Sequence, residues 1–419
     1  MFNASRHRPT LDDQLLDAHG YHEIFEALRR RAAERPSLLV QRRPGTIGLR
    51  WVLAHEARLT ETILEALVSP GFQLGNHRRV TIFAGKKRDI YVAEWPDRIV
   101  LMRMGRLLSE RMESTLSERV YSFRKGRSHW DALEGLKTFL RQRSGGEPIH
   151  VLRRDVTKFG DSIDPERALA QAHQSLGIAP DSVFGRMLAL GLHIRFEVDG
   201  AETSLETGIP SGSPLVPPLE NLYLDALDRQ LAALPDTFYA RYGDDLLVAT
   251  PHAAVAEDAR GIIRDVIAER GLRISPSKAL DVTVTDANQG FEWLGFRVGR
   301  DGRLGPKRAR WREARRQLCA ELDRFVGTVF RADLDEAQRV AVLREGLAQI
   351  LTPAGSPWLA SMVFEQDDPR SLRELDAQLV KHLADTLGTA LGGGRQRGWR
   401  LFRKLGYRSL IHQRHQRWA

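Results

Sequence analysis

Two adjacent carboxylates, Asp244 and Asp245, interrupt an otherwise apolar segment that reads Ala-Arg-Tyr-Gly-Asp-Asp-Leu-Leu-Val-Ala over residues 240–249. Successive side chains of a strand point to opposite faces, so both acids can serve one site only if the chain turns there. Gly243 permits a tight hairpin turn that includes Asp244. Carboxylates about 4 Å apart repel by about 4 kcal/mol at an effective dielectric constant near 20, and a divalent metal ion relieves that repulsion. The segment by itself also fits an ordinary surface turn.

A third carboxylate, Asp155, stands near the end of a separate strand-like run, Ile-His-Val-Leu-Arg-Arg-Asp-Val over residues 149–156. Three carboxylates delivered by two strands can hold two Mg²⁺ ions about 3.5–4 Å apart, one activating an attacking hydroxyl and one steadying a leaving phosphate. We therefore predict a two-metal site at Asp155, Asp244 and Asp245, with Mg²⁺ as the ion and Mn²⁺ as the alternative.

The hydrophobic periodicity predicts the elements that must position these acids, in an α+β arrangement. Helical spacing runs through residues 11–67, with breaks at Pro36, Pro44 and Gly45, and again through 97–115, 128–143 and onward from 308. Strand-like segments are 79–83 and 90–92, around a basic turn at 85–88, and then 149–156, 238–242 and 246–249. Because the acids stand at the ends of the last three strands, we expect the central sheet to bring them together.

The length and composition exclude several classes of protein. The chain has 419 residues, enough for two to four domains, and 42% hydrophobic against 28% charged residues excludes a disordered or collagen-like chain. No apolar run approaches the about 18 residues that a membrane helix needs, and the N-terminus lacks a signal-peptide core, so we expect a cytoplasmic protein without a membrane partner. The single cysteine, Cys319, excludes an internal disulfide and a zinc site built from several thiolates.

The positive charge is concentrated at the C-terminus. The chain has a formal net charge of +9, and the segment 392–419 carries eight lysine and arginine residues and no acidic residue. Aromatic rings are interleaved with these cations, a mixture that suits nucleic acid. The candidate nucleic-acid-binding residues of this tail are Arg395, Arg397, Trp399, Arg400, Arg403 and Lys404. The alternative interpretation is a solvated terminal helix that docks its aromatic side chains on the body of the protein.

The segment Tyr-Gly-Asp-Asp at 242–245 resembles the Tyr-x-Asp-Asp box of reverse transcriptases, and further boxes of that family follow in the same order over roughly residues 75 to 300. The matching segments are Lys86-Lys87-Arg88 with Asp97-Arg98-Ile99-Val100, Tyr-Ser-Phe-Arg-Lys-Gly-Arg-Ser at 121–128, Asp-Val-Thr-Lys-Phe-Gly-Asp-Ser-Ile at 155–163, Gly-Ile-Pro-Ser-Gly-Ser-Pro-Leu-Val-Pro at 208–217, Asn-Leu-Tyr-Leu at 221–224, Lys278 and Trp-Leu-Gly-Phe at 293–296. No single box is unique to the family, but their shared order makes the resemblance specific.

The resemblance implies a right-hand polymerase fold, with fingers and a palm built from an antiparallel sheet plus helices, and a helical thumb. We expect a helical N-terminal extension at 1–74, fingers at 75–150, a palm at 151–299 with a fingers insertion at about 165–205, and a helical thumb with the basic tail at 300–419.

The resemblance also implies roles for individual residues. Asp155 and Asp244 would be direct metal ligands, with Asp245 completing the acidic centre. Arg88, with Lys86, would clamp the incoming triphosphate, and Lys278 would be the acid near the pyrophosphate leaving group. The remaining implied residues are Phe159, Gly160, Ser211, Gly212 and Tyr242 around the nucleotide, Leu294, Gly295 and Phe296 in the primer grip, and Arg124 and Arg127 on nucleic acid.

Three positions depart from the family pattern near the expected nucleotide pocket. Gly160 stands where the family generally has Phe or Tyr, a ring that excludes a ribose 2′-hydroxyl, although Phe159 next to it would take over if the register shifts by one. Ser211 replaces a glutamine, and Val216 replaces a serine. An apolar wall contributes only about 1–3 kcal/mol of discrimination, and glycine supplies no wall. We expect a pocket that tolerates unusual substrates or a restricted template, with neutral drift as the alternative.

The resemblance favours an RNA-directed DNA polymerase, a nucleotidyltransferase, whose partners are structured RNA, nascent DNA and dNTPs. The altered pocket and the N-terminal helices favour a bacterial phage-defence type, by analogy alone. Diversity-generating and domesticated intron enzymes are alternatives, as is template-independent or protein-primed synthesis with relaxed sugar selection. A non-enzymatic RNA-binding scaffold is disfavoured, because a dead site needs no cluster of mutually repelling acids. The oligomeric state, the template and the primer stay open.

Overall fold

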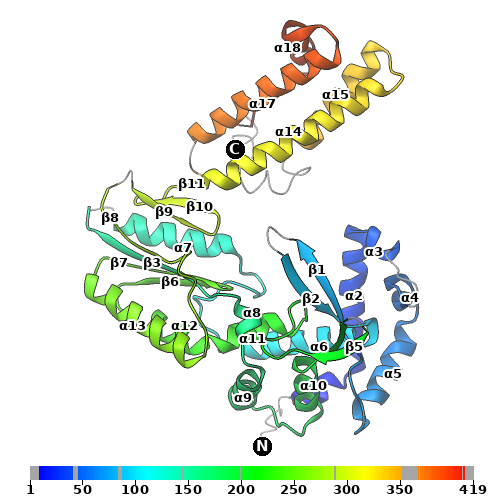
Figure 1. Cartoon of the computed structure of the whole chain (residues 1–419), viewed down its shortest axis with the longest axis vertical. Coiled ribbons are helices and arrows are strands. Elements are labelled where there is room, and N and C mark those ends of the chain that lie inside the picture. The colour runs from blue at the N-terminus through cyan, green and yellow to red at the C-terminus, as the bar shows by residue number, and fades with distance from the viewer. Residues whose placement is uncertain are drawn as a thin grey trace, which may run out of the picture. The chain divides into compact units, whose positions relative to one another are not determined.

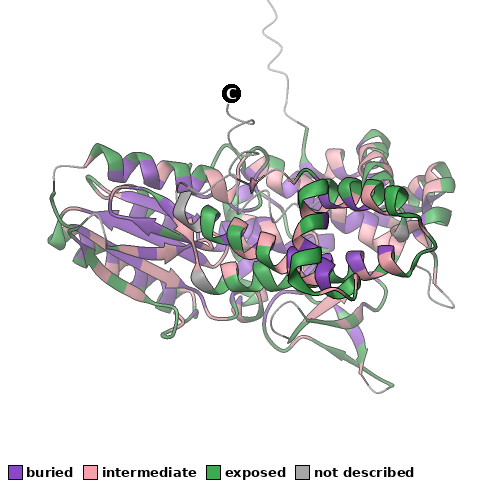
Figure 2. Cartoon of the chain, turned by 90° about the horizontal axis from the view of Figure 1, so that it is seen from above, coloured by how far each residue is buried: buried purple, intermediate pink, exposed green. Residues whose placement is uncertain are grey.

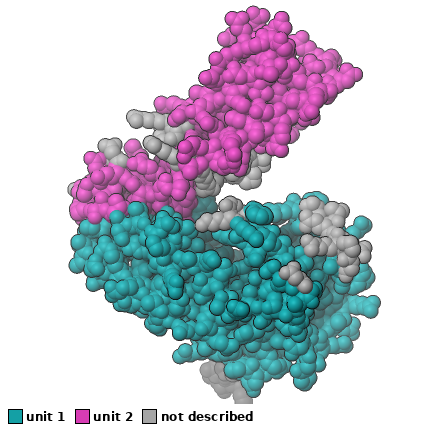
Figure 3. Space-filling view, in the orientation of Figure 1, with its two compact units in different colours: residues 1–132, 150–281 teal, residues 133–149, 282–419 magenta. Residues whose placement is uncertain are grey.

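The computed structural model describes residues 9–40, 46–83, 87–143, 146–198, 200–286, 289–351, 367, 369–407 and 409–410. The chain forms two compact units, one of residues 1–132 and 150–281 and the other of residues 133–149 and 282–419 (Figure 3). Its helices and antiparallel sheets confirm the predicted α+β class. No helix in the described ranges is long and apolar enough to span a membrane. The assignment of fingers, palm and thumb to residue ranges stays a prediction.

The first unit begins with the predicted helical region. Its helices are α1 (Leu11–Leu15), α2 (Ala18–Glu34), α3 (Ser37–Val40), α4 (Leu49–Ala54) and α5 (Glu56–Val68), and α6 (Trp95–Met112) follows the first hairpin (Figure 1). Asp17 caps α2 by accepting a hydrogen bond from the backbone of His19. Helices α1, α2 and α5 pack against α6, whose apolar side chains are almost fully buried in the shared core.

The first hairpin of the chain is formed by β1 (Arg78–Phe83) and β2 (Lys87–Val92). The strands are antiparallel, with Phe83 opposite Lys87 and Ile82 opposite Arg88. The sequence analysis placed residues 85–88 in a turn, whereas Lys87 and Arg88 are paired strand residues, because the ladder extends further toward the tip. Lys86 lies outside the described residues.

The central sheet has the strand order β6 (Phe238–Tyr242), β7 (Asp245–Thr250), β3 (Ile149–Asp155), β8 (Leu280–Val284). Every residue of β7 is buried, and Figure 2 shows strands that are buried over most of their length. Helices α12 (Asp225–Ala232) and α13 (Ala253–Glu269) pack beside β6 and β7. Burial on both faces explains why these strands read as continuous apolar runs. Strand β8 passes the boundary of the two units at Asp281.

The segment between β3 and β6 carries short elements around the sheet's end. They are α8 (Phe159–Ser162), α9 (Pro165–Leu176), α10 (Val183–Leu192), β4 (Arg195–Val198), β5 (Ala201–Ser204) and α11 (Val216–Tyr223). Asp164 caps α9, Pro165 opens it, and Gly177 ends it in a left-handed conformation. Helix α11 packs against both α6 and α9, so it joins the N-terminal helices to the sheet.

The second unit combines a small sheet with helices. Its strands β9 (Gly290–Trp293), β10 (Phe296–Gly299) and β11 (Leu304–Pro306) are antiparallel, and α7 (His129–Gln142) enters this unit at residue 133. The predicted return to helix at 308 is confirmed by α14 (Arg308–Arg331), α15 (Glu336–Ile350), α17 (Pro369–Ala390) and α18 (Gly394–Lys404). These four helices share a core composed largely of leucine side chains.

Candidate active site

The register of the central sheet brings two of the predicted acids face to face. Strands β3 and β7 pair antiparallel, with Asp155 directly opposite Asp245. Residues opposite each other in an antiparallel pair project from the same face of the sheet. Asp244 stands in the two-residue turn between β6 and β7, immediately before Asp245. Residues 155, 244 and 245 therefore lie together at one end of the sheet.

The turn that carries Asp244 has the geometry that the sequence predicted. Gly243 has a φ of 65°, in the left-handed region where a side chain is disfavoured. The backbone oxygen of Asp244 accepts a hydrogen bond from the nitrogen of Val156, 2.9 Å away. The turn is therefore tied to the residue after β3, which places Asp244 beside the end of that strand.

Asp155 is paired with a lysine from a distant part of the chain. Its side chain is 7% exposed, and its Oδ2 lies 2.5 Å from the Nζ of Lys278, whose own side chain is 44% exposed. The backbone oxygen of Asp155 also accepts a hydrogen bond from the nitrogen of Ser275. The sequence analysis expected Lys278 near a leaving group, and the structure brings it to the acidic centre.

Asp245 is paired within the sheet. Arg153 donates from Nε to Oδ1 at 3.0 Å and from Nη2 to Oδ2 at 2.6 Å, a bidentate ion pair. Arg153 stands two residues before Asp155 and so projects from the same face of β3. Both oxygens of Asp245 are thus engaged by a guanidinium, which fixes the orientation of the carboxylate at the end of the sheet.

The pKa of Asp244 is raised by burial, and the neighbouring charge of Asp155 acts in the same direction. A buried carboxylate next to another gains from a cation, and oxygen-only donors of this type are the ones that Mg²⁺ prefers. Asp155 and Asp244 therefore fit a divalent ion by the chemistry of their donors. No group of three or more His, Cys, Asp or Glu side chains in the described residues is arranged to hold a metal ion. The role of Asp245 as a third ligand stays a prediction.

A buried ion pair between β6 and α12 stabilises the turn that carries Asp244. The side chains of Arg241 and Asp228 are fully buried and 2.6 Å apart, and the hydroxyl of Tyr239 donates to Asp228 at 2.6 Å. Nη1 of Arg241 donates to the carbonyl of Gly243 at 3.2 Å and to the side-chain oxygen of Asn221 at 3.2 Å. Arg241 therefore links the turn before Asp244 to helices α11 and α12.

A carboxylic acid, Glu220, borders the position where the family generally has an aromatic ring. A Cβ atom placed on Gly160 would lie 3.1 Å from Oε1 of Glu220 and 3.6 Å from Oγ of Ser211. Burial raises the pKa of Glu220 to about 7; Arg241 opposes that shift, whereas Asp244 and Asp161 add to it. The absent side chain at 160 thus leaves space beside a protonatable carboxyl group rather than an apolar cavity.

The other predicted nucleotide-binding residues lie on several elements. Gly212 has a φ of 93°, and a Cβ there would meet Ile90 of β2 at 3.1 Å, so glycine allows the close approach of this loop to the hairpin. The backbone oxygen of Ser211 accepts a hydrogen bond from the nitrogen of Tyr91 at 2.8 Å. Arg88 is exposed on β2, whereas the ring of Phe159 is 5% exposed and belongs to the hydrophobic core.

The two arginines of the 121–128 segment differ in their availability. The side chain of Arg124 is 4% exposed, and it binds the carboxylate of Glu113 at 2.7 Å and the backbone oxygen of Ser117 at 2.7 Å. It therefore holds the loop together rather than presenting a free charge to nucleic acid. Arg127 is less buried, donates to the backbone oxygen of Glu118 and lies over the ring of Tyr121.

The predicted primer-grip residues form a tight turn in the second unit. Leu294 has a φ of 46° and Gly295 a φ of 87°, between the paired residues Trp293 and Phe296. Two successive residues with positive φ define the hairpin turn that matches the twist of antiparallel strands. Trp293 and Phe296 are buried beneath the turn, which holds Leu294 in this strained conformation.

Helix α18 docks on the other helices of the second unit, as the alternative interpretation of the basic tail expected. Its Leu401 is buried in the core of that unit, and Phe402 packs partly buried against the same core, as does Tyr407 after the helix. Contact of this helix with nucleic acid stays a prediction. Arg395 pairs with Asp385 of α17 at 2.8 Å, and Lys404 pairs with Glu336 of α15 at 2.8 Å. These two cations are exposed, as are Arg397, Arg400 and Arg403, and Trp399 is partly exposed beside them.

Sequence reasoning missed the residues that orient the acids. The position of Arg153 could have been predicted, because an arginine two positions before Asp155 on a strand projects from the same face of that strand. The ion pair of Arg241 could also have been predicted, since a charged residue inside an apolar strand indicates a buried ion pair. Glu220 lies on α11, 60 residues from Gly160 in the chain, and no local pattern joins them.

Comparison with known proteins identifies the family. The model of the family described as reverse transcriptase (RNA-dependent DNA polymerase) matches residues 84–298, about half of the chain. No curated protein sequence is significantly similar to this chain.

Solved structures that resemble the chain include telomerase from Candida albicans in complex with a fragment of telomeric RNA, at 12% identity and a TM-score of 0.48 over 85% of this chain and 66% of that one. Apo telomerase from Candida tropicalis is similar at 10% identity and a TM-score of 0.48, over 83% of this chain and 68% of that one. A form of the Candida tropicalis enzyme truncated from its C-terminal domain matches over 57% of this chain and 56% of that one, at 10% identity and a TM-score of 0.47. This chain thus spans from just over half to about two thirds of the length of these telomerases.

The family match agrees with the ordered sequence boxes and with the strand-end carboxylates at 155, 244 and 245. The match to residues 84–298 includes both strands and the turn that bear these acids, together with Lys278 and Glu220. The chain is a member of the reverse transcriptase (RNA-dependent DNA polymerase) family.

Proposed function

We propose that the protein extends the 3′ end of a nucleic acid by copying an RNA template into DNA, with two divalent metal ions at its acidic centre. One observation carries this proposal: the register of β3 with β7 sets Asp155 opposite Asp245, and the adjoining turn adds Asp244. Two of these three carboxylates are balanced by cations. An ordinary surface turn or a non-enzymatic scaffold does not require three carboxylates at one end of a sheet.

Asp155 and Asp244 are the side chains that would hold the metal. When bound, Mg²⁺ would activate the 3′-hydroxyl of the strand being extended and would stabilise the leaving pyrophosphate. The ion pair of Lys278 with Asp155, at 2.5 Å, supports a role for this lysine at the acidic centre: it would meet the negative charge of a triphosphate or donate a proton to the leaving group. Arg153 keeps the Asp245 carboxylate oriented, and Arg241 keeps the turn in place.

The test is primer extension by the purified full chain. An RNA template annealed to a DNA primer is offered with Mg²⁺ and either the four dNTPs or the four rNTPs, and the same primer is offered without template. Template-directed incorporation of dNTPs supports the proposal. Incorporation only without template would replace it with the template-independent alternative, and no incorporation under any of these conditions would contradict it.

Sugar selection is expected to respond to the pair Gly160 and Glu220. Glu220 crowds a side chain at position 160, because a Cβ alone already lies 3.1 Å from its carboxylate oxygen. We expect the double variant G160F/E220A to favour dNTPs over rNTPs by about 10–200-fold relative to the wild type, the discrimination that an apolar wall supplies. Single-nucleotide incorporation kinetics measure this ratio, and an unchanged ratio would show that position 160 does not face the sugar.

The partly buried carboxyl group of Glu220 is expected to make the free energy of unfolding depend on pH. Its pKa is about 7 in the folded chain and about 4.5 unfolded, so the folded state binds the extra proton and loses stability as pH rises from about 4.5 through 7. The loss is at most about 3–4 kcal/mol, at 1.36 kcal/mol per unit of pKa. E220Q should therefore be more stable than the wild type at pH 8 and closer to it at pH 5.

Urea unfolding at the two pH values measures this difference. Glu206→Gln is the control, because Glu206 is an exposed carboxylate in the same unit. If E220Q and E206Q show the same change between pH 5 and pH 8, Glu220 is not the partly buried acid that the geometry indicates.

We also propose a role in bacterial antiviral defence with a dedicated structured RNA. Supporting it are the altered pocket at Gly160 and Ser211 and the exposed cations of α18, Arg397, Arg400 and Arg403. Sequencing the nucleic acid that co-purifies with the protein tests the RNA partner. Phage plating on cells that carry the wild type or the D155N variant tests the defence role, which requires protection by the wild type alone.

A further inference from the structure

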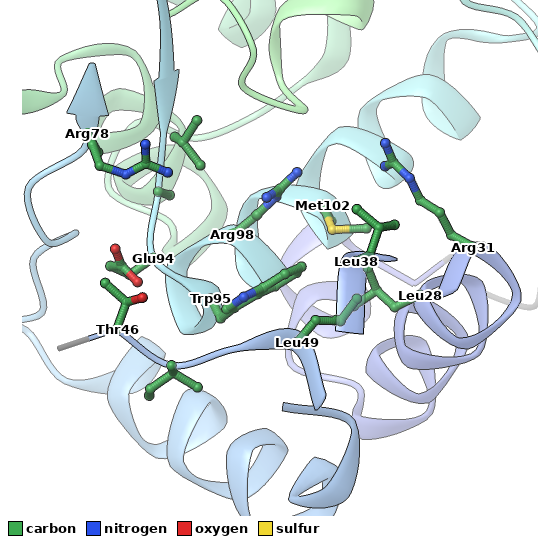
Figure 4. A pocket seen from close by; sticks show the side chains of 13 residues that line it. Leu28, Arg31, Leu38, Thr46, Leu49, Arg78, Glu94, Trp95, Arg98 and Met102 are labelled. Carbon is green, nitrogen blue, oxygen red and sulfur yellow. The ribbon is translucent and has the colours of Figure 1, made fainter. Parts of the chain in front are cut away.

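A cavity lies in the first unit, among the N-terminal helices and the hairpin, and shares no residue with the acidic centre (Figure 4). Its volume is about 500 Å³. Small-molecule sites in proteins commonly measure about 300–1,000 Å³. Helix α2, strands β1 and β2, the start of α6 and the segment before α4 all contribute to its wall.

Three arginines line this cavity from three different elements. Arg31 belongs to α2, Arg78 opens β1, and Arg98 lies in the first turn of α6. In the view of Figure 4 their guanidinium groups lie along one side of the cavity, above the indole of Trp95. Within the described chain none of the three forms an ion pair with a carboxylate, and Glu94 is the one acidic residue of the lining.

The three charges act on one another. The pKa of Arg98 is lowered by burial, and the charges of Arg31 and Arg78 lower it further. The guanidinium of Arg98 also lies over the ring of Trp95, 4.9 Å from its centre, which fixes its position. Unpaired cations that share a half-buried cavity are unfavourable by themselves, and an anion bound among them removes that cost.

Part of the cavity lining is apolar. Leu28, Leu38 and Met102 line it together with Trp95, and Figure 4 shows Met102 and Leu38 between Arg98 and Arg31. Planar guanidinium groups match phosphate oxygens in bidentate geometry, and aromatic and aliphatic side chains accept a base or a ribose. A ligand that uses both parts of the lining has a phosphate and a flat, partly apolar group, and this combination describes a nucleotide.

We propose that this cavity is a second nucleotide-binding site, with the phosphate at Arg31, Arg78 and Arg98 and the base against Trp95 and its aliphatic neighbours. The nucleotide is either free in solution or the 5′ end of an RNA strand, since the two share this chemistry. Binding of a nucleotide in this cavity requires neither a metal ion nor catalysis, so it can be tested independently of polymerase activity.

Calorimetric titration of the full chain in EDTA tests the proposal, because a nucleotide at the acidic centre depends on divalent metal ions. The probes are ATP, a 12-nucleotide RNA with a 5′-triphosphate, the same RNA with a 5′-hydroxyl, and inorganic tripolyphosphate. Tight binding of ATP assigns the site to a free nucleotide. Binding of the triphosphorylated RNA in strong preference to ATP and to the 5′-hydroxyl RNA assigns it to an RNA end.

Two variants and a matched control locate the binding. Arg78→Gln and Arg31→Gln should each weaken binding by about 10–100-fold, the loss expected for a charge-assisted hydrogen bond to phosphate. Arg79→Gln should leave binding unchanged, because Arg79 neighbours Arg78 on β1 but does not line the cavity. Arg31 is exposed on α2, so R31Q removes the charge without disturbing the core.

Three results would overturn the proposal. The first is the absence of saturable binding of ATP and of triphosphorylated RNA by the wild type in EDTA. The second is an equal effect of R78Q, R31Q and R79Q, which would indicate general attraction of anions. The third is binding of tripolyphosphate as tight as that of ATP, which would show that the apolar residues take no part.

Discussion

The D244N variant is expected to lose nucleotide incorporation by at least about a hundredfold to a thousandfold, the loss typical when a group that stabilises transition-state charge is removed. Asp244 stands in the turn beside the end of β3, and the carboxylate of Asp155 is close enough to act on its pKa. Asparagine preserves the shape of the turn but removes the negative charge that a metal ion needs. Primer extension under single-turnover conditions measures the change.

Two comparisons make this result specific to the acidic centre. Asp258→Asn, on the exposed surface of α13, removes one negative charge from the same unit and should leave incorporation unchanged. Binding of the template RNA by D244N should equal that of the wild type. If D244N incorporates nucleotides at the wild-type rate, the acidic centre is not the catalytic site, and the RNA-binding scaffold becomes the better interpretation.

The R241M variant is expected to destabilise the first unit by about 3–5 kcal/mol, because it leaves the charge of Asp228 buried without its partner. Both side chains are fully buried and share two hydrogen bonds, at 2.6 and 2.8 Å. The loss also frees the carbonyl of Gly243, so the turn with Asp244 should become more mobile. Hydrogen exchange of peptides from β6 and β7 measures both effects.

A second substitution separates lost packing from the unpaired charge. The double variant D228L/R241M removes both charges, so it should recover much of the stability that R241M loses. Arg264→Met, in the exposed pair with Asp265 on α13, should leave exchange in β6 and β7 unchanged. Equal destabilisation by R241M and by the double variant would show that the volume of the arginine matters and its charge does not.

The turn at Gly243 and Asp244 was predictable because its causes are local. A glycine, two acids and apolar residues on either side are adjacent in the chain, and only a tight turn allows both strands to continue. The burial of β7 was predictable for the same reason, since an unbroken apolar run signals a strand covered on both faces.

The partners of the acids were not predictable in the same way. Lys278 stands 123 residues after Asp155, and a resemblance to the family suggested its neighbourhood without the ion pair that the structure shows. Arg124 illustrates the converse: its place in a basic motif predicted contact with nucleic acid, but the folded loop encloses it with Glu113 and backbone oxygens. Charge in a sequence does not reveal whether a neighbour has already compensated it.

The amino-acid order by itself determined the family, the class of fold and the identity of the three acids, because each depends on residue types at short spacings. Tertiary structure alone decided that Asp155 faces Asp245, that Glu220 borders the space at Gly160, and that three distant arginines enclose one cavity. The physical reason is range: turn and strand preferences act between neighbours in the chain, whereas electrostatic pairing and steric exclusion act between neighbours in space.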